Sequence, residues 1–335
     1  MYHFSDIIGE DRLTGHLRET IRSGKLSHAY ILTGPKGSGK MMLAETFAAC
    51  LCCTGRGESG DEPCGECLSC IQAEGHNHPD IVYVQHEKPR TISVNDIRSL
   101  REDTAIRPYQ SSHKVYIMED ADLMNPAAQN ALLKTLEEPP SYVCILLLAQ
   151  SEDQFLPTIQ SRCVHLRMQP VAEPLVEDYL RSARGVEPGW ARICAGFSGG
   201  SIGRAVSLAT DETFRERREA AVKLMRGIHT ADTASLAAFA QEAAKDTAVL
   251  DETAEFIRMW CRDVMRCAAA GDTDSLFYAD EDAAIFEESL KLSPGDIGRV
   301  MDALEEYDYR MRYNASAAPA LTSLLLKIRD AGSKE

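Results

Sequence analysis

A short β-prone run leads directly into a glycine loop, and this pairing constrains the fold more than any other feature of the chain. The run covers 29–33, and the loop that follows reads Gly34-Pro35-Lys36-Gly37-Ser38-Gly39-Lys40. Beyond the loop, apolar residues recur at the spacing of one helix face: Met42, Leu43, Phe47 and Leu51. A strand, a glycine loop and a helix in this order form a phosphate cradle. Backbone N–H groups surround the anion there, and Lys40 supplies a positive charge.

The residue after Lys40 departs from the form of this loop that hydrolyses nucleotides, G-x-x-x-x-G-K-[ST]. The last position is Met41. A Ser or Thr hydroxyl there would ligate Mg²⁺, and a thioether cannot replace that hard oxygen. The loop therefore leaves the binding of ATP, ADP or phosphate open, since a backbone cradle at a helix N-terminus binds anions without hydrolysing them. Mg²⁺-dependent hydrolysis is expected to be weak or absent.

A second departure lies after the apolar run 115–118, where Glu119-Asp120 stands in place of the usual Asp-Glu. In that motif the Asp orients the Mg²⁺ shell and the Glu polarises water. The reversed order displaces both groups by about a methylene, and catalysis tolerates such displacement poorly. Taken alone, the pair would also fit a solvated acidic loop.

Two more apolar runs, 81–84 and 143–148, predict buried strands, and helical patterns cover 94–104 and 126–137. Strands that alternate with helices in this way form a parallel α/β sheet. Near residue 168 the pattern changes, and from there to the end it is almost wholly helical. We therefore expect an α/β domain followed by helical parts.

Six of the 11 cysteines fall within 21 residues. Cys64, Cys67 and Cys70 are each separated by two residues, which puts three thiolates on a tight knuckle. A fourth ligand would close a tetrahedral zinc site. Such a cluster in a chain with no visible secretion signal indicates a metal rather than disulfides. Reduced cysteines without a metal are the alternative.

Cys53 is our preferred fourth ligand, because it ends the predicted helix and a Gly/Glu-rich loop follows it. Cys50 and Cys52 remain open as alternatives, and His76 and His78 lie nearby as less favoured ones. With four protein ligands no coordination position is open, so the zinc would be structural.

The formal net charge is −15, and neither half of the chain is basic. This balance argues against a chain that grips nucleic acid by itself, because phosphate contacts need Lys and Arg. No apolar run approaches the roughly 18 residues of a membrane span. The start of the chain has no basic segment leading into an apolar one, so we expect no signal peptide, no membrane contact and a cytoplasmic location.

Several segments together resemble the bacterial clamp-loader family of AAA+ proteins. They are Phe4-x₂-Ile7-Ile8-Gly9, the run from Leu26 to Pro35, the four-cysteine insert, the run Asn130-Ala131-Leu132-Leu133-Lys134-Thr135-Leu136-Glu137-Glu138-Pro139-Pro140, and Ser161-Arg162-Cys163. The resemblance covers residues 1 to about 205. It implies an AAA+ nucleotide-binding-like base over 1–168 with its zinc module at about 50–78, a helical lid over 169–208, and an all-α collar over 209–335 that matches only by helicity and length.

The resemblance also implies roles for two arginines. Arg162 would be an arginine finger supplied in trans to the ATP site of a neighbouring gamma/tau subunit, although an arginine there is by itself more often a surface ion-pair partner. Arg204 would be a second nucleotide sensor in the lid; an ordinary surface arginine is the alternative. The implied partners are the gamma/tau and delta subunits of a hetero-oligomeric ring, with the sliding clamp and primed DNA met through that complex.

Two other functions compete with this assembly subunit. A gamma/tau-type motor shares the zinc knuckle and Ser161-Arg162-Cys163, but Met41 and the Glu119-Asp120 order speak against it, as does a chain that ends at residue 335 without a long tail. A stand-alone DNA-binding module is disfavoured by the net charge.

Overall fold

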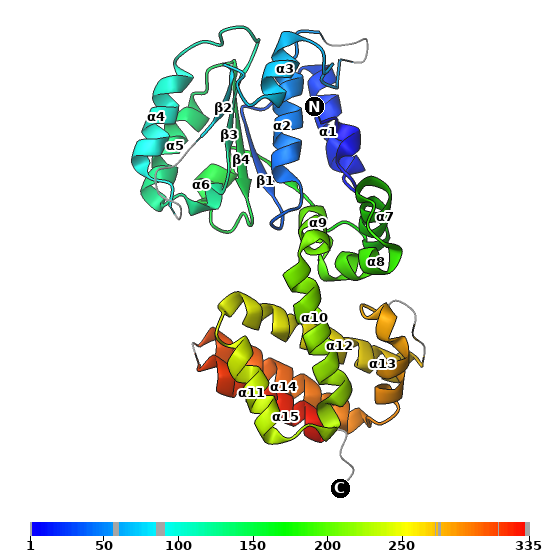
Figure 1. The fold of residues 1–335 in the computed structure, drawn as a ribbon. Helices are drawn as coiled ribbons and strands as arrows, with labels where there is room; N and C mark the ends of the chain where they lie inside the picture. Colours follow the sequence, from blue (N-terminus) through cyan, green and yellow to red (C-terminus); the bar gives the residue numbers. More distant parts are fainter. Residues whose placement is uncertain are drawn as a thin grey trace. The chain divides into compact units, whose positions relative to one another are not determined.

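The computed structural model describes residues 2–55, 60–84, 91–271, 273, 276–313 and 315–331. They form two compact units, which are seen in Figure 1. The first unit extends to Tyr179 and also includes Ser198–Val206. The second unit comprises Leu180–Phe197 and the chain from Ser207 onward.

A five-stranded parallel sheet forms the centre of the first unit. Its strand order is β2-β3-β4-β1-β5, so the strand that precedes the glycine loop lies between two neighbours. The strands are β1 (Ala29–Thr33), β2 (Ile81–Tyr83), β3 (Lys114–Met118), β4 (Val143–Ala149) and β5 (Val164–Arg167). The predicted fold class is confirmed: an α/β unit with a parallel sheet, followed by a helical region.

The sequence analysis missed the fifth strand. β5 pairs with β1, with Tyr30 opposite Val164 and Thr33 opposite Arg167. Of its four residues only Leu166 is buried, and His165 and Arg167 are exposed. A short edge strand of this kind has no continuous apolar run, so the pattern that revealed the other four strands is absent.

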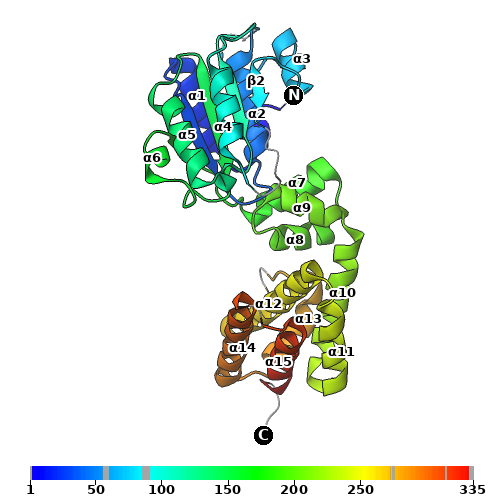
Figure 2. The same cartoon turned by 90° about the vertical axis from the view of Figure 1, so that its left-hand side faces the viewer.

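Helices cover both faces of the sheet (Figures 1 and 2). On one side lie α1 (Asp11–Ser23), α2 (Lys40–Cys52) and α3 (Leu68–Glu74), and on the other α4 (Val94–Thr104), α5 (Pro126–Glu137) and α6 (Pro157–Gln160). Consecutive residues of β4 face opposite cores because side chains alternate along a strand. Leu146 packs with Leu17 and Phe47, whereas Leu147 packs with Ile97 and Leu132.

Short 3₁₀ turns and helices complete the chain. The turns are Phe4–Asp6, Ala121–Leu123, Ile228–Thr230 and Ala279–Glu281. The helices after β5 are α7 (Glu173–Arg184), α8 (Pro188–Phe197), α9 (Ile202–Thr210), α10 (Glu212–Gly227), α11 (Thr233–Ala243), α12 (Thr247–Ala270), α13 (Asp282–Ser289), α14 (Pro294–Arg312) and α15 (Ala317–Ala331). Within the described residues, none of these helices combines the length and apolarity needed to cross a bilayer.

Aromatic rings form the core of the second unit. Phe197 lies 5.3 Å from Phe256 and 5.6 Å from Tyr278 between ring centroids. Trp260 is buried and donates its indole N–H to Glu288 at 2.9 Å. Tyr307 is also buried, whereas Tyr309 is 63% exposed.

Candidate functional site

The glycine loop joins the end of β1 to the start of α2. Gly37 and Gly39 have φ values of 77° and 94°, which residues with a Cβ rarely adopt. Gly39 is the N-cap of α2, and Lys40 is the first residue of that helix. The local fold is therefore the strand–loop–helix cradle that the sequence predicts, with the N-terminus of α2 directed at the loop.

Lys40 is turned onto the loop itself. Its Nζ donates to the carbonyl oxygens of Gly34 at 2.8 Å and of Pro35 at 2.9 Å. Burial lowers the pKa of Lys40, and the carboxylates of Asp122, Asp120 and, more weakly, Glu119 oppose that shift. The positive charge that would meet a phosphate is thus satisfied by the loop's own backbone.

The beginning of α9 contacts the tip of the same loop. The Ser201 hydroxyl donates to the carbonyl oxygen of Lys36 at 3.0 Å, and the Gly203 N–H donates to that of Gly37 at 2.9 Å. A Cβ placed on Gly203 would lie 2.8 Å from the Gly37 oxygen, so only glycine fits this approach. The next residue, Arg204, donates its backbone N–H to the Ser201 hydroxyl and is exposed.

The acidic pair follows β3 and is exposed. Glu119 and Asp120 come directly after the buried strand, and Asp120 has a left-handed φ of 47°. Asp122, to which the sequence analysis gave no role, accepts the Gln150 N–H at 3.1 Å and is the strongest charge partner of Lys40. The sequence pointed to Asp122 only through its place in the same acidic run. Its position near Lys40 depends on the 3₁₀ turn over 121–123, in which it lies.

Arg162 lies on the turn between α6 and β5. Its guanidinium forms an ion pair with Glu137 at 2.9 Å and donates to the carbonyl oxygen of Thr158, also at 2.9 Å. The side chain remains 35% exposed. Glu137 is the last residue of α5 and Thr158 lies in α6, so contacts from two helices hold the guanidinium. Burial raises the pKa of the neighbouring Cys163 thiol to about 12, which makes it a packing residue rather than a nucleophile.

The four cysteines Cys53, Cys64, Cys67 and Cys70 come together at the C-terminal end of α2. Their sulfur atoms all lie within 4.8 Å of one another, and this cluster is able to bind a metal such as zinc. The knuckle is shaped by backbone N–H groups: that of Cys67 donates to the Cys64 sulfur and that of Cys70 to the Cys67 sulfur, both at 3.4 Å. Burial opposes ionisation of Cys67, but the Cys70 N–H and further hydrogen bonds from Thr54 and Cys64 outweigh it and lower its pKa to about 5, whereas burial raises the pKa of Cys53 and of Cys70. Four sulfur atoms gathered this closely fit the donor set of a thiolate-bound metal.

The other candidate ligands have different surroundings. Cys50 and Cys52 belong to the apolar core beside α2. His78 accepts the backbone N–H of Asp80 at 3.0 Å, and the His76 ring lies 2.9 Å from the Tyr83 hydroxyl. Cys53 is thus the fourth member of the cluster among the described residues.

Known proteins with a similar sequence identify the family. A family model described as "DNA polymerase III, delta subunit" matches residues 9–172. The delta-prime subunit of DNA polymerase III from Bacillus subtilis is 30% identical over 327 residues, which cover 96% of each chain. The chain belongs to the DNA polymerase III delta-prime family. A delta-prime subunit from Haemophilus influenzae is 33% identical over 171 residues, 51% of each chain.

Subunits of the tau and gamma/tau type match a smaller part of this delta-prime chain. The tau subunit of DNA polymerase III from Bacillus subtilis is 32% identical over 211 residues, which cover 61% of this chain and 37% of tau. The delta-prime match instead runs through nearly the whole of both sequences. At the level of family, the predicted assembly subunit is confirmed over the gamma/tau-type alternative.

Proposed function

We propose that this chain, a delta-prime clamp-loader subunit of DNA polymerase III, contributes Arg162 in trans to the ATP site of a neighbouring gamma/tau subunit and hydrolyses little or no nucleotide itself. Its partners are then the gamma/tau and delta subunits of the ring, and it meets the sliding clamp and primed DNA through that complex. The domain limits 1–168, 169–208 and 209–335 and a cytoplasmic location belong to the same proposal.

The observation that carries the proposal is the setting of Arg162. Glu137 and the Thr158 carbonyl hold its guanidinium on a short turn, and about a third of the side chain is exposed. An arginine fixed in this way is pre-organised to meet charge on a phosphoryl group brought by another subunit, and little side-chain freedom remains to be lost.

The glycine loop supports the proposal that the chain hydrolyses little or no nucleotide itself. Met41 offers no oxygen to Mg²⁺, Lys40 is bonded to carbonyl groups, and the start of α9 contacts the loop. The exposed Glu119-Asp120 pair has the reversed order of acids. Each feature weakens metal-dependent hydrolysis, while the cradle stays compatible with ATP, ADP or phosphate.

We further propose that Cys53, Cys64, Cys67 and Cys70 hold a structural zinc ion. When bound, the zinc would supply cross-linking of the knuckle without an open coordination position. The four cysteines tie the end of α2 to the start of α3.

ATP turnover in the reconstituted clamp loader tests the finger. Arg162→Ala is expected to reduce turnover at the neighbouring gamma/tau site by ~10²-fold or more, because stabilisation of the transferred phosphoryl is lost. Arg107→Ala, a change at another exposed arginine of the first unit, is the matched control and should leave turnover unchanged. Ring assembly is measured in parallel by size-exclusion chromatography. Unchanged turnover in an assembled Arg162→Ala complex would refute the role.

A further inference from the structure

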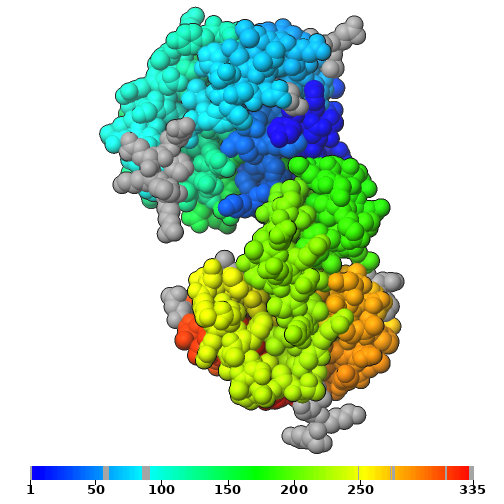
Figure 3. Space-filling model, viewed as in Figure 1, coloured from blue at the N-terminus to red at the C-terminus, as the bar shows by residue number. Residues whose placement is uncertain are grey.

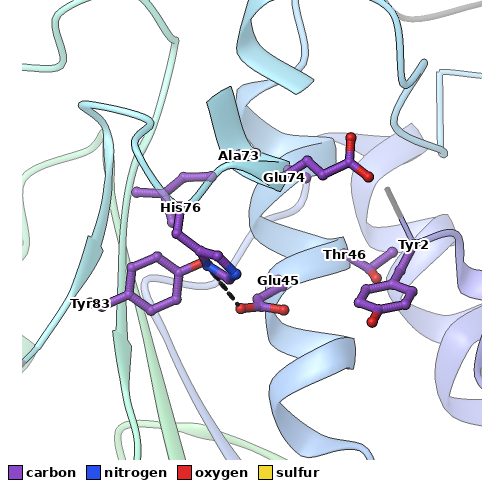
Figure 4. A pocket seen from close by; sticks show the side chains of 9 residues that line it. Tyr2, Glu45, Thr46, Ala73, Glu74, His76 and Tyr83 are labelled. Carbon is purple, nitrogen blue, oxygen red and sulfur yellow. Dashed lines mark hydrogen bonds and ion pairs between the residues drawn. The ribbon is translucent and has the colours of Figure 1, made fainter. Parts of the chain in front are cut away.

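A cavity of about 260 Å³ opens between α2, α3 and β2 of the first unit (Figure 4). Its lining includes none of the loop residues and none of the four clustered cysteines. Small and apolar side chains, Ala49, Ala73 and Ile81, leave the space, and the half-exposed Tyr2 lies at its edge. Sites for drug-sized ligands span ~300–1,000 Å³, so this cavity has room for one long side chain rather than for a nucleotide.

Glu45 is the fixed acceptor of the cavity. The Tyr83 hydroxyl donates to Glu45 Oε1 at 3.2 Å and lies 2.9 Å from Nδ1 of His76. Nδ1 of His76 also lies 3.4 Å from Glu45 Oε1, so a protonated His76 forms an ion pair with this carboxylate. Burial raises the pKa of Tyr83, and Glu45 raises it further, so the hydroxyl stays protonated. The contacts of Glu45 with Tyr83 and His76 both use Oε1, and its other carboxylate oxygen points toward Tyr2 in Figure 4.

His76 reaches this position through an unusual backbone conformation. Its φ is 53°, and among the described residues only Asp120 shares a left-handed φ without being glycine. The ring packs edge-on against Tyr83, with centroids 5.3 Å apart. The conformation belongs to the turn that ends α3: the His76 N–H donates to the Ala73 carbonyl oxygen at 3.1 Å, and the Asn77 N–H donates to that of Gln72 at 3.0 Å. Helix-ending turns of this kind place a left-handed residue just after the helix, and here that residue brings its ring against Tyr83.

The charges of the lining select the sign of a ligand. Glu45, whose side chain is 20% exposed, and Glu74 supply two carboxylates against the one imidazole of His76, and no lysine or arginine lines the cavity. Anions are therefore disfavoured and cations favoured. A guanidinium suits the site better than an ammonium, because its planar fork matches a carboxylate and its face stacks on aromatic rings such as Tyr2 and Tyr83.

An apolar stripe continues from the cavity along α3. Leu68 and Ile71 are 63% and 56% exposed, and with Glu74 they recur every three residues on one helix face. In Figure 3 the segment that contains α3 forms the sky-blue outer surface of the first unit. Exposed apolar residues beside a pocket for one charged side chain are the anatomy of a protein interface, whereas a free cation would have no use for the stripe.

We propose that this surface, the cavity at Glu45 together with Leu68 and Ile71, binds a segment of a partner protein. The segment inserts an arginine side chain toward Glu45 and lays apolar side chains on α3. This interaction is separate from nucleotide chemistry, since neither the glycine loop nor Arg162 belongs to the surface. A metal bound by the four cysteines would then also hold α3 in place for docking.

A titration series with small ligands tests the charge selection. The full chain is titrated with N-acetylarginine amide, N-acetyllysine amide and N-acetylcitrulline amide while the His76 and Tyr83 ring signals are followed by NMR. Arginine is expected to bind with a Kd on the order of 1 mM, lysine more weakly and neutral citrulline not at all. Citrulline binding as tightly as arginine, or arginine leaving both rings unchanged, would overturn the proposal.

Glu45→Gln keeps the size and the acceptor but removes the charge, and it should weaken arginine binding by ~10-fold or more. Glu102→Gln, which changes an exposed carboxylate on α4, is the matched control and should bind as the parent does. Equal binding by the two variants contradicts the assignment to Glu45. If Glu45→Gln folds poorly, the titrations of the parent chain with the arginine, lysine and citrulline amides still test whether the cavity selects a cation.

A peptide separates a protein segment from a free cation. A capped hexapeptide with one arginine between leucines should bind ~10-fold more tightly than N-acetylarginine amide, because it also covers Leu68 and Ile71. The double change Leu68→Ser and Ile71→Ser should abolish that advantage and leave the amide unaffected. Equal affinity of peptide and amide for the parent chain would show that the site takes a free cation, and the docking proposal would fall. Reconstituted ATPase activity is independent of these readouts.

Discussion

The glycine loop and the Arg162 turn are the two places where nucleotide contacts are proposed, and the fold gives their cations different partners. Lys40 gives its ammonium group to two carbonyl oxygens of its own loop, and α9 adds two hydrogen bonds to the loop tip. Arg162 forms an ion pair with Glu137, donates to the Thr158 carbonyl oxygen and is 35% exposed. Both cations are half-buried and bonded within the chain, so the difference lies in the partner: backbone carbonyl groups for Lys40 and a carboxylate for Arg162. For the role in trans proposed above, the contact with Glu137 is therefore the one to test.

The contrast predicts a large difference between two alanine variants in the reconstituted complex. Lys40→Ala should change total ATP turnover by less than about twofold, because hydrolysis at this chain's own loop contributes little. Arg162→Ala should lower turnover at the adjoining gamma/tau site by ~10²-fold or more. Single-turnover ATPase measurements on the two complexes make the comparison. A Lys40→Ala loss as large as the Arg162→Ala loss would show that the loop is itself a working site.

The ion pair with Glu137 should account for part of the effect of Arg162. Glu137→Gln keeps a hydrogen-bond acceptor but weakens the hold on the guanidinium, so turnover at the adjoining site should fall by about tenfold. If Glu137 acts only by positioning Arg162, adding Glu137→Gln to Arg162→Ala should not lower turnover any further. A clear additional loss in the double variant would mean that Glu137 acts independently. Glu138→Gln, at the next position along the chain, provides the matched control.

Opening the contact between α9 and the loop should raise nucleotide affinity. Gly203→Ala places a Cβ 2.8 Å from the Gly37 oxygen, so the two segments must separate. ADP affinity should then increase by about three- to tenfold, because a larger fraction of molecules has an accessible cradle. Gly15→Ala on α1, where an added Cβ meets no atom within 4 Å, controls for a general helix effect. Calorimetry with ADP decides the matter, and weaker binding by Gly203→Ala would mean that α9 supports the nucleotide instead.

Metal removal should affect the loop side more than the Arg162 side. The cysteine cluster lies at the C-terminal end of α2, whose first residue is Lys40, whereas Arg162 follows α6 on the other face of the sheet. Chelation should expose amides in 64–76 to hydrogen exchange while Arg162-dependent turnover changes by less than about twofold. A collapse of turnover on chelation, in rings that remain assembled, would show that the knuckle also supports the arginine edge.

Periodicity and motif spacing predicted most of the first unit because its elements are strongly patterned. The strand 29–33 and the helices 94–104 and 126–137 have the bounds that were expected. Residue type also indicated the metal cluster, since cysteines two residues apart place their sulfur atoms on one knuckle. β5 could not be found in this way, because an exposed edge strand such as 164–167 has no apolar run.

The sequence alone determined which chemistry is present: a cradle with Met41, a reversed acid pair, four thiols and an arginine in a family-specific setting. Only the tertiary structure decided what these groups contact. Lys40 meets carbonyl groups, Gly203 donates to the tip of the loop, and Cys53 rather than Cys52 joins the cluster. The reason is physical. Residue types and spacing act over a few positions, whereas these contacts join segments that are distant along the chain and become neighbours only when the sheet and its helices pack.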